Sequence, residues 1–591
     1  MPVEKSCFSG SKIEYRIPCT STEGLLCVIF KDLRLWNEFF WPLGFELREF
    51  SPGQLSLAAV SGWNSCLKEK QRSDAATLLQ HLLTHHRCIV SADLNVTILK
   101  GHDQLIRGAL HRSPSLRKLK LNLLDLAANA SLSFVATLPK LNELRELELR
   151  HVPFDRPTLQ NFSKFLANTR SLTTLNMTYQ DIKRQYAVIL IQGLERNKTI
   201  TTLSINASLQ GPDSSKRASM FSNYLRLNQT LCTLNVTSRS YSELNDLRPT
   251  IGALFENNAL SELNLIGFEL DFHRHELITS MLIENGKLRS LNMIECFSIL
   301  YTGHGHSIVE PMHSAFREES SLISIWLVVL AENNTLNEVT LDMLWMEPDD
   351  YGLFFKALAC NTSLKKVNVP KFKNRDVAEI CRSLQEAGVQ ERVCLGKHNV
   401  SEETAAVLPE CKEVSCIALE RCTCFHYEAL HTTLRQLPRC SDVKSLCLSF
   451  AMEVMDDRLM SLMVQYLTKT TALRELRFRH PQAIKGFQFG EIESQMLADM
   501  LESNRTLCDL FLDTHNDPST VSLTHKLSTT ISGNYTLLRI NLHLSELCGG
   551  ELFTTEDVVR RNNSLATRAA HFITGARHRC CAVAAEQVQL L

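Results

Sequence analysis

Two stretches of the chain gather side chains that bind metals in other proteins. One is "CFSILYTGHGHSIVEPMH", with Cys296, His304, His306 and His313; the other is "CKEVSCIALERCTCFHYEAL", with Cys411, Cys416, Cys422, Cys424 and His426. Thiolate sulfur and imidazole nitrogen are typical zinc ligands, but neither spacing matches a standard structural zinc site. The 20 cysteines also lack paired spacing, which favours reduced core thiols over a disulfide framework. We therefore predict no metal site, with zinc binding as the alternative for both stretches.

Catalytic motifs are absent from the sequence. It contains no G-x-S-x-G, no H-E-x-x-H, no protein-kinase motif set and no G-x-x-x-x-G-K-[ST] phosphate loop. Only 23 of the 591 residues are Gly, so the chain has little of the loop material from which active sites are built. We expect neither an enzyme nor a cofactor.

Asn-x-Ser/Thr triplets occur fourteen times, and seven of them recur at one place in a repeating pattern. These seven begin at Asn197, Asn228, Asn333, Asn361, Asn504, Asn534 and Asn562. Each lies three residues before an apolar position that starts a strand-like pattern. This phase predicts a structural turn, in which Asn adopts left-handed backbone geometry and Ser or Thr bonds the local backbone. The alternative is a set of glycosylation sites on a secreted protein.

The repeating pattern is apolar-x-x-apolar-x-apolar, mostly at steps of 28 to 31 residues. It starts at Ile89, Leu116, Leu144, Leu172, Ile200, Leu231, Leu260, Leu288, Leu336, Leu364, Gln390, Val414, Val443, Leu473, Leu507, Leu537 and, in degenerate form, Leu565. The last two apolar residues have period two, which predicts a short strand, and helical apolar spacing precedes them. Such a strand–helix unit buries its apolar faces only by stacking on its neighbours. The sequence therefore predicts an α/β solenoid with a concave parallel sheet and convex helices, capped at both ends.

Three segments are expected along the chain. Residues 1–82 are an N-terminal capping region, residues 83–565 are the repeats, and residues 566–591 are a C-terminal helical cap. The step from Leu288 to Leu336 is about twenty residues too long, which predicts a surface insertion near 296–315.

The lines "NNALSELNL", "NNTLNEVTL" and "NRTLCDLFL" resemble leucine-rich repeats of the ribonuclease-inhibitor subtype, also found in the sensor arms of NLR-type proteins. The resemblance implies a horseshoe-shaped solenoid that binds proteins, here without the nucleotide-binding module of an NLR. At the ninth repeat position the family prefers Asn or Cys, whereas only Cys296 and Cys422 fit here. "GLLCVIFKDL" and "QLSLAAVSGWNSCL" also resemble the two halves of an F-box, which would require three helices within 24–67.

Charge and hydropathy bear on partners and compartment. Lys and Arg number 63 and Asp and Glu 64, so no overall field attracts nucleic acid or anionic lipid. No segment has the apolar length of a signal-peptide core or a membrane span. We expect a cytoplasmic protein that binds neither nucleic acid nor membrane.

The outward positions of each predicted strand define a candidate partner-binding face. It carries short uncharged side chains, such as Thr202 and Asn235, in the early repeats and charges of both signs elsewhere. The predicted partner-binding residues are Lys118, Lys120, Glu146, Glu148, Arg150, Glu338, Asp342, Glu475, Arg477, Arg479, Asp509, Asp513 and Arg539. We predict a non-enzymatic scaffold that binds a protein partner. The alternatives are a substrate receptor of a ubiquitin ligase and a GTPase-activating protein of the Ran type.

Overall fold

The computed structural model describes residues 17–589 apart from 22–25, 42–43, 61–68, 96–100, 125–127, 181, 184, 210–215, 239–246, 269, 297–321, 423–426, 451–456, 480–490, 513–518, 543–548 and 577. The chain forms two compact units. Unit 1 comprises Met1–Leu144, Asn399–Pro409 and Cys416–Leu591, and unit 2 comprises Arg145–His398 and Glu410–Ser415.

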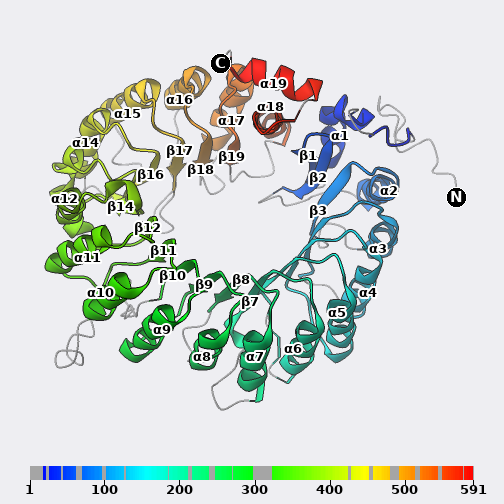
Figure 1. Ribbon diagram of the computed structural model, residues 1–591. Helices are drawn as coiled ribbons and strands as arrows, with labels where there is room; N and C mark the ends of the chain where they lie inside the picture. The colour runs from blue at the N-terminus through cyan, green and yellow to red at the C-terminus, as the bar shows by residue number, and fades with distance from the viewer. Residues whose placement is uncertain are drawn as a thin grey trace. The chain divides into compact units, whose positions relative to one another are not determined.

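Unit 2 repeats a short strand followed by a helix (Figure 1). Its strands are β5 (Glu146–Arg150), β6 (Thr174–Tyr179), β7 (Thr202–Asn206), β8 (Thr233–Thr237), β9 (Glu262–Ile266), β10 (Ser290–Ile294), β11 (Glu338–Leu341), β12 (Lys366–Val369) and β13 (Val393–Leu395). Its helices are α5 (Arg156–Asn168), α6 (Ala187–Arg196), α7 (Lys216–Leu227), α8 (Arg248–Glu256), α9 (Phe272–Glu284), α10 (Leu322–Glu332), α11 (Pro348–Cys360) and α12 (Val377–Ala387). Short 3₁₀ turns are η5 (Ala207–Leu209), η6 (Asn374–Asp376) and η7 (Gln390–Arg392).

Consecutive strands of unit 2 pair in parallel, in the register that the repeat pattern predicts. Leu203 of β7 lies opposite Leu234 of β8, and both side chains are fully buried between the strands and the helices. Residues that alternate with them face away from the helices. In β8 all three of these are partly exposed, whereas in β7 only Thr202 is partly exposed and Ser204 and Asn206 are buried. The predicted parallel sheet with helices on one face is confirmed.

Eight asparagines each hold the turn that leads into a repeat strand, and we call them the turn asparagines. They are Asn197, Asn228, Asn257, Asn285, Asn333, Asn361, Asn504 and Asn534. In each, the side-chain oxygen accepts hydrogen bonds from backbone N–H groups two and three residues later. The amide nitrogen of Asn197 donates to the carbonyl of Leu166 in the preceding repeat at 2.7 Å, and six of the other seven repeat this bond.

The prediction that these asparagines form turns is therefore confirmed, but the predicted left-handed backbone conformation is wrong. The backbone of Asn197 is extended, with φ −73° and ψ 140°, and those of Asn257 and Asn361 are similar. The side chain, rather than a left-handed backbone, makes the turn. Asn257 and Asn285 do the same without a following Ser or Thr two positions on. All eight side chains are buried, so a sugar on any of them is incompatible with the folded state.

Arg392 makes backbone contacts like those of a turn asparagine in one of the repeats that lack one. Its guanidinium donates to the carbonyls of Leu358 and Asn361 at 2.9 and 2.8 Å and also to that of Leu364. Three backbone carbonyls thus hold the side chain of Arg392.

Unit 1 contains both ends of the described chain. Its first part has η1 (Val28–Phe30), α1 (Leu33–Phe40), β1 (Phe45–Ser51), β2 (Gln54–Ala59), α2 (Glu69–His85), β3 (Ile89–Asn95), α3 (Asp103–Arg112), β4 (Lys118–Asn122), α4 (Ala128–Val135) and η4 (Leu138–Lys140). Its last part has α13 (Glu402–Ala405), β15 (Cys416–Cys422), α14 (Tyr427–Gln436), η10 (Leu437–Arg439), β16 (Ser445–Phe450), α15 (Asp457–Lys469), β17 (Glu475–Phe478), α16 (Glu491–Ser503), β18 (Asp509–Leu512), α17 (Ser519–Thr530), η12 (Ile531–Gly533), β19 (Arg539–Leu542), α18 (Gly549–Ile573) and α19 (Arg579–Gln589). Two short elements, β14 (Lys397–Asn399) and η8 (Leu408–Glu410), span the points where the chain changes unit.

The N-terminal capping region contains a β-hairpin that the sequence reading missed. β1 pairs antiparallel with β2, and the turn between them places Gly53 at φ +78°, a conformation that favours glycine. β2 then pairs in parallel with β3, the strand of the first repeat. Within 24–67 the described residues form a helix and this hairpin, so the three-helix arrangement required of an F-box is wrong for them.

The C-terminal boundary of the repeats also differs from the prediction. α18 runs without interruption from Gly549 to Ile573, through the expected boundary between 565 and 566, and no strand forms at Leu565. Asn562, predicted as a turn residue, lies inside this helix, where its amide donates to the carbonyls of Asn534 and Leu537. The helix expected from residue 566 onward therefore begins at Gly549.

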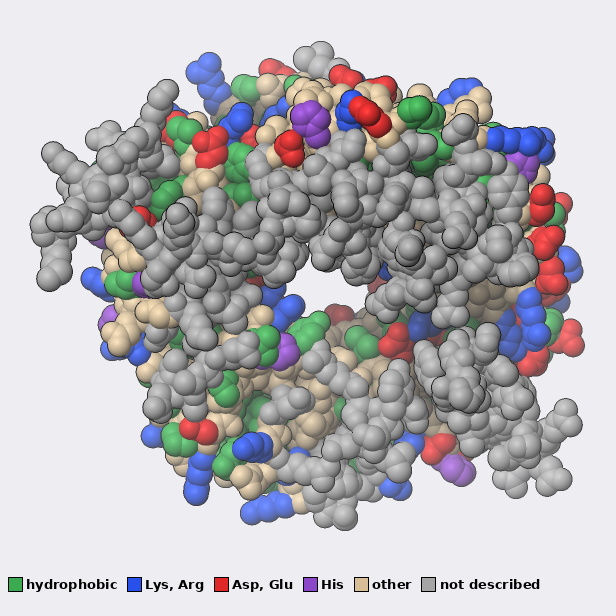
Figure 2. Space-filling model, turned by 180° about the vertical axis from the view of Figure 1, so that it is seen from behind, with side chains coloured by type: hydrophobic (Ala, Val, Ile, Leu, Met, Phe, Trp, Pro, Cys, Tyr) green, Lys and Arg blue, Asp and Glu red, His purple; other side chains and the backbone are tan. Residues whose placement is uncertain are grey.

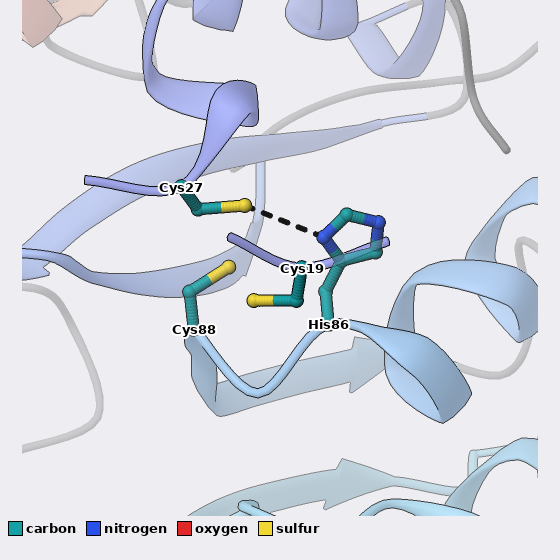
Figure 3. Close-up of side chains that lie close together, drawn as sticks. All are labelled: Cys19, Cys27, His86 and Cys88. Carbon is teal, nitrogen blue, oxygen red and sulfur yellow. Dashed lines mark hydrogen bonds between the residues drawn. The ribbon is translucent and has the colours of Figure 1, made fainter. Parts of the chain in front are cut away.

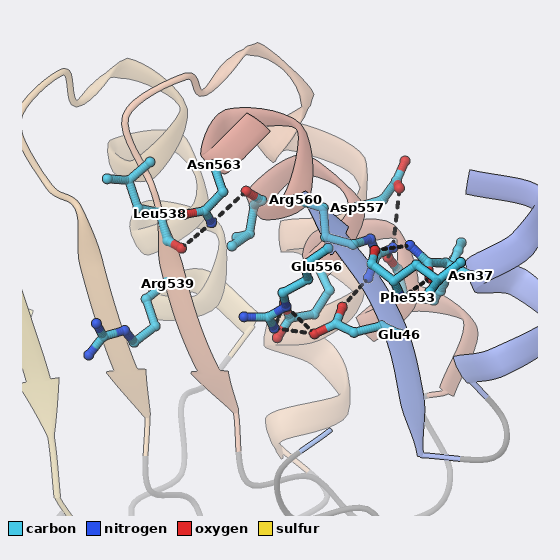
Figure 4. A network of polar contacts seen from close by, with 12 residues as sticks. Asn37, Glu46, Leu538, Arg539, Phe553, Glu556, Asp557, Arg560 and Asn563 are labelled. Atoms are coloured by element: carbon cyan, nitrogen blue, oxygen red, sulfur yellow. Dashed lines mark hydrogen bonds and ion pairs between the residues drawn. The ribbon is translucent and has the colours of Figure 1, made fainter. Parts of the chain in front are cut away.

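α18 packs on β1, so the two ends of the described chain meet within unit 1 (Figure 4). Arg560 donates to Glu46 at 2.9 Å and to Asp557 at 3.1 Å, and Arg568 donates to Glu49 at 3.0 Å. Among the described helices, none combines the length and the apolar character needed to cross a bilayer.

Candidate functional site

The strand face opposite the helices carries most of the predicted partner-binding residues. Each β-strand alternates its side chains between the two faces, so the residues next to a buried leucine point away from the core. Glu146, Glu148 and Arg150 of β5, and Glu338 of β11, are all partly exposed on this face in unit 2. Lys118 and Lys120 of β4 lie on the corresponding face in unit 1. Figure 2 shows side chains of both charge signs interspersed over the described part of the surface in view.

Most charged residues on this face lie beside an opposite charge. Lys120 contacts Asp93 of β3 at 2.7 Å, and Arg150 contacts Glu148 at 2.5 Å while its guanidinium lies 4.4 Å from the ring centre of Tyr179. Lys366 contacts Glu338 at 2.8 Å, and hydrogen bonds from Lys366 and then Asn368 hold the pKa of Glu338 below its usual value. The surface thus offers alternating charges already held in place.

A row of small polar side chains crosses the centre of the face in unit 2, and we call it the amide row. Strand register aligns Asn176, Ser204, Asn235, Asn264, Asn292, Thr340 and Asn368 on successive strands. Asn235 donates to Ser204 at 2.7 Å, Asn264 donates to Asn235 at 2.6 Å, and Asn368 donates to Thr340 at 3.0 Å. Hydrogen bonding between neighbours thus fixes five members of the row, Ser204, Asn235, Asn264, Thr340 and Asn368, before any partner arrives.

Asp342 is an exception among the predicted residues. It was expected on the exposed face, but only 1 % of the residue is accessible to solvent, because it follows β11 where the chain turns back over the core. Its carboxylate accepts a hydrogen bond from the backbone N–H of Glu295 at 2.7 Å, and burial raises its pKa. Asp342 thus holds a turn, and it is not part of the exposed face.

A second group of predicted residues comes together on β17, β18 and β19 of unit 1, and we call it the charged patch. It consists of Glu475, Arg477, Arg479, Asp509 and Arg539. Register places Glu475, Asp509 and Arg539 side by side. Arg477 pairs with Glu475 and lies 6.0 Å from the ring centre of Phe511, and Arg539 lies 3.6 Å from Asp509. Asp513, the remaining member of the prediction, lies outside the described residues.

The two Cys- and His-rich stretches do not form a metal site among the described residues. Cys296 is buried, its thiol donates to the carbonyl of Leu265, and burial raises its pKa to about 12. Cys411 is buried next to the thiol of Cys381. His304, His306, His313, Cys424 and His426 lie outside the described residues. The interpretation as core thiols holds for Cys296 and Cys411.

A different cluster, which the sequence reading missed, brings together three thiols and one imidazole in unit 1 (Figure 3). Cys19, Cys27, His86 and Cys88 place their sulfur and nitrogen atoms within 4.8 Å of one another. Hydrogen bonds from Cys27 and then Cys88 lower the pKa of the Cys19 thiol. The available signal was the His-x-Cys pair just before the first repeat strand, but its partners lie about sixty residues earlier.

Comparison with known proteins gives remote structural similarity only. No protein-family model matches the chain. No curated protein matches it either. The chain is similar to the leucine-rich repeat-containing protein LegL7 from Legionella pneumophila, with 12 % identity, coverage of 61 % of this chain and 97 % of that chain, and a TM-score of 0.31. It is also similar to a chain in the yeast Rad7 and Elc1 complex, with 14 % identity, coverage of 69 % and 81 %, and a TM-score of 0.32.

The class of protein follows from the repeat itself. A strand with two buried apolar residues, a helix, and a hydrogen-bonded turn recur along both units in one phase. This is the architecture of a leucine-rich-repeat solenoid.

Proposed function

We propose that this protein is a non-enzymatic, cytoplasmic recognition scaffold of the ribonuclease-inhibitor type, similar to an NLR sensor arm, which binds a protein partner through its strand face. The proposal rests on one observation: side chains on that face are held in place by hydrogen bonds to one another. Side-chain hydrogen bonds of 2.7 and 2.6 Å join Ser204, Asn235 and Asn264 across three strands. Side chains that are already fixed lose little conformational entropy when a partner binds, so more of the contact energy appears as affinity.

The charges on the face favour a protein partner over a nucleic acid. A nucleic-acid groove clusters Lys and Arg without acidic neighbours, because phosphates repel carboxylates. In the charged patch, by contrast, Arg477 lies beside Glu475, and Arg539 lies beside Asp509. A surface of mixed sign is complementary to another protein surface of mixed sign, and such matching selects the partner and orients it.

The experiment first identifies the partner and then measures affinity. Proximity labelling in the native cell, with the full chain as bait, supplies candidates, and calorimetry with the purified pair gives Kd. We expect Arg477→Ala combined with Arg479→Ala to fold normally and to weaken binding at least about tenfold, or roughly 1.4 kcal/mol. The matched control is Arg435→Ala with Lys469→Ala, which removes two exposed charges from helices α14 and α15 and should leave Kd unchanged.

Two results would change the proposal. If Thr202→Ala or Asn235→Ala weakens binding and the double Arg variant does not, the site lies on the strand face of unit 2, at β7 and β8. If the purified chain accelerates GTP hydrolysis by Ran, the non-enzymatic part of the proposal is wrong.

A further inference from the structure

The cluster of Cys19, Cys27, His86 and Cys88 has the donor set of a structural zinc site. Three thiolates and one imidazole form the Cys₃His set that binds Zn²⁺ tetrahedrally in structural sites. Zn–S bonds of about 2.3 Å and Zn–N bonds of about 2.0 Å imply edges of roughly 3.5–3.8 Å between ligand atoms in a tetrahedron. The four ligand atoms here all lie within 4.8 Å of one another, and Cys27 Sγ is 3.5 Å from His86 Nδ1. A small inward movement of the side chains completes the tetrahedron.

The surroundings of the cluster are those of a closed site. Cys27, His86 and Cys88 are 0, 1 and 2 % exposed, and Cys19 is partly exposed. Figure 3 shows the three sulfur atoms and the imidazole converging on one point between the chain segments. Catalytic zinc sites keep one position open for water or substrate, whereas structural sites use four protein ligands. Four protein donors with this burial indicate a structural role.

Local structure holds the four side chains toward one another. Cys27 immediately precedes η1, and the hydroxyl of Thr20 accepts a hydrogen bond from the backbone N–H of Val28 at 3.0 Å, which ties the segment of Cys19 to that of Cys27. His86 and Cys88 lie in the turn from α2 to β3, and the carbonyl of Cys88 accepts from Leu55 of β2 at 2.7 Å. One pair of ligands thus comes from the N-terminal segment and the other from the turn between α2 and β3.

We propose that Cys19, Cys27, His86 and Cys88 bind one zinc ion, which fastens the N-terminal segment to the turn before the first repeat strand. Binding forms three Zn–S bonds and one Zn–N bond, and the thiol protons that are still present pass to solvent, with no change in oxidation state. The ion joins residues up to 69 positions apart and encloses the hairpin β1–β2 within the linked segment. A metal crosslink of this kind stabilises the cap that covers the first repeat.

The test uses the full chain, expressed with added zinc and purified under reducing conditions. Elemental analysis should find about one zinc per chain, since the donor set forms a single four-ligand site. Cys27→Ser combined with Cys88→Ser should lose at least nine-tenths of it. The control is Cys232→Ser with Cys394→Ser, two exposed cysteines of unit 2, which should retain the full content.

A second measurement keeps the test valid if the double Cys variant fails to fold. Protein refolded with Co²⁺ should show the strong visible absorption of tetrahedral cobalt–thiolate coordination. His86→Cys should keep a four-ligand site with a shifted spectrum, and His86→Ala should weaken Co²⁺ binding at least tenfold. Wild-type protein without zinc, zinc content unaffected by the Cys27 and Cys88 changes, or a disulfide among Cys19, Cys27 and Cys88 that persists under the reducing conditions of the purification would each overturn the proposal.

Discussion

Arg560 Nη1 in α18 lies 2.9 Å from Glu46 Oε2 in β1, although 514 residues separate them in the chain. Their side chains are only 4 and 0 % exposed, and the guanidinium also lies 4.8 Å from the ring centre of Phe553 and 5.6 Å from that of Trp41. The nearby carboxyl of Glu556 has its pKa raised to about 7, first by burial and then by the charge of Glu46. The ends of the described chain thus meet at a buried ion pair within unit 1.

Removal of one partner from this pair should destabilise unit 1 strongly. Among the described residues, Glu46→Ala leaves Arg560 only its ion pair with Asp557, and Arg560→Ala leaves Glu46 only its ion pair with Arg48. Loss of one partner of a buried ion pair costs up to about 3–5 kcal/mol. The free energy of unfolding from urea denaturation measures the loss. The control Glu491→Ala breaks the exposed contact of Glu491 with Lys526, which contributes about 1 kcal/mol or less. Equal losses for the buried and exposed variants would contradict this account of the contact.

The role of the turn asparagines can be tested by comparing two adjacent asparagines, one buried and one exposed. Asn257 is buried and makes four hydrogen bonds to backbone groups, whereas Asn258 is exposed. Asn257→Ala should cost at least about 2 kcal/mol, because two backbone N–H groups and two carbonyls lose their side-chain partner. Asn258→Ala should stay within about 0.5 kcal/mol of the wild type in the same denaturation experiment. A similar cost for both variants would rule out this role of the buried amide.

The strand register predicts the effect of two leucines. Leu203 and Leu234 are fully buried neighbours on β7 and β8, so Leu203→Ala or Leu234→Ala should cost roughly 2–5 kcal/mol. Leu227→Ala is the control, since that side chain at the end of α7 is 66 % exposed. Stability of the Leu203 and Leu234 variants equal to that of the wild type in denaturant melts would refute the register.

His398 should make the protein sensitive to acid. It is fully buried, stacks on Phe372 with ring centres 6.2 Å apart, and has no hydrogen-bond partner for either ring nitrogen among the described residues. Burial lowers its pKa from 6.5 to about 4. Because the unfolded chain binds this proton near pH 6.5 and the folded chain only near pH 4, the stability linked to His398 is complete above pH 6.5. It declines by about 1.4 kcal/mol per pH unit as the pH falls toward 4.

The variant His398→Phe tests this dependence by removing the titrating group. Between pH 7.5 and pH 5, the free energy of unfolding of the wild type should fall by about 2 kcal/mol more than that of His398→Phe. His571→Phe, at an exposed position of α18, should follow the wild type. Parallel pH profiles for the wild type and His398→Phe would show that His398 does not titrate in this way.

The sequence was sufficient to predict elements governed by local periodicity. Pairs such as Leu147 and Leu149 have the period of a strand and lie in β5, and the register of the charged patch follows from the same rule. Asn197 was recognised as a turn residue from its phase, but its extended backbone was not, because the choice depends on a carbonyl in the preceding repeat. Asp342 was misplaced because the strand pattern does not show where β11 ends.

Features that depend on contacts between distant segments were not predicted from the sequence. The β1–β2 hairpin had a local signal in Pro52 and Gly53 between two alternating apolar runs, which the search for helical repeats passed over. The contact of Glu46 with Arg560, and the convergence of Cys19 with His86, had no such signal. Both depend on how the folded chain brings remote residues together.

The turn asparagines also show how the solenoid accommodates repeats that contain different numbers of residues. The bond from Asn285 to the carbonyl of Leu254 spans 31 residues, and the equivalent bond from Asn333 to Leu282 spans 51, yet the donor–acceptor distances are 2.6 and 2.5 Å. The spacing between successive repeats is therefore set by the turn asparagine. It does not depend on the number of residues between one turn asparagine and the next. We therefore expect that an affinity tag inserted between β10 and α10 would lengthen the polypeptide while Asn333 keeps its bond to the carbonyl of Leu282.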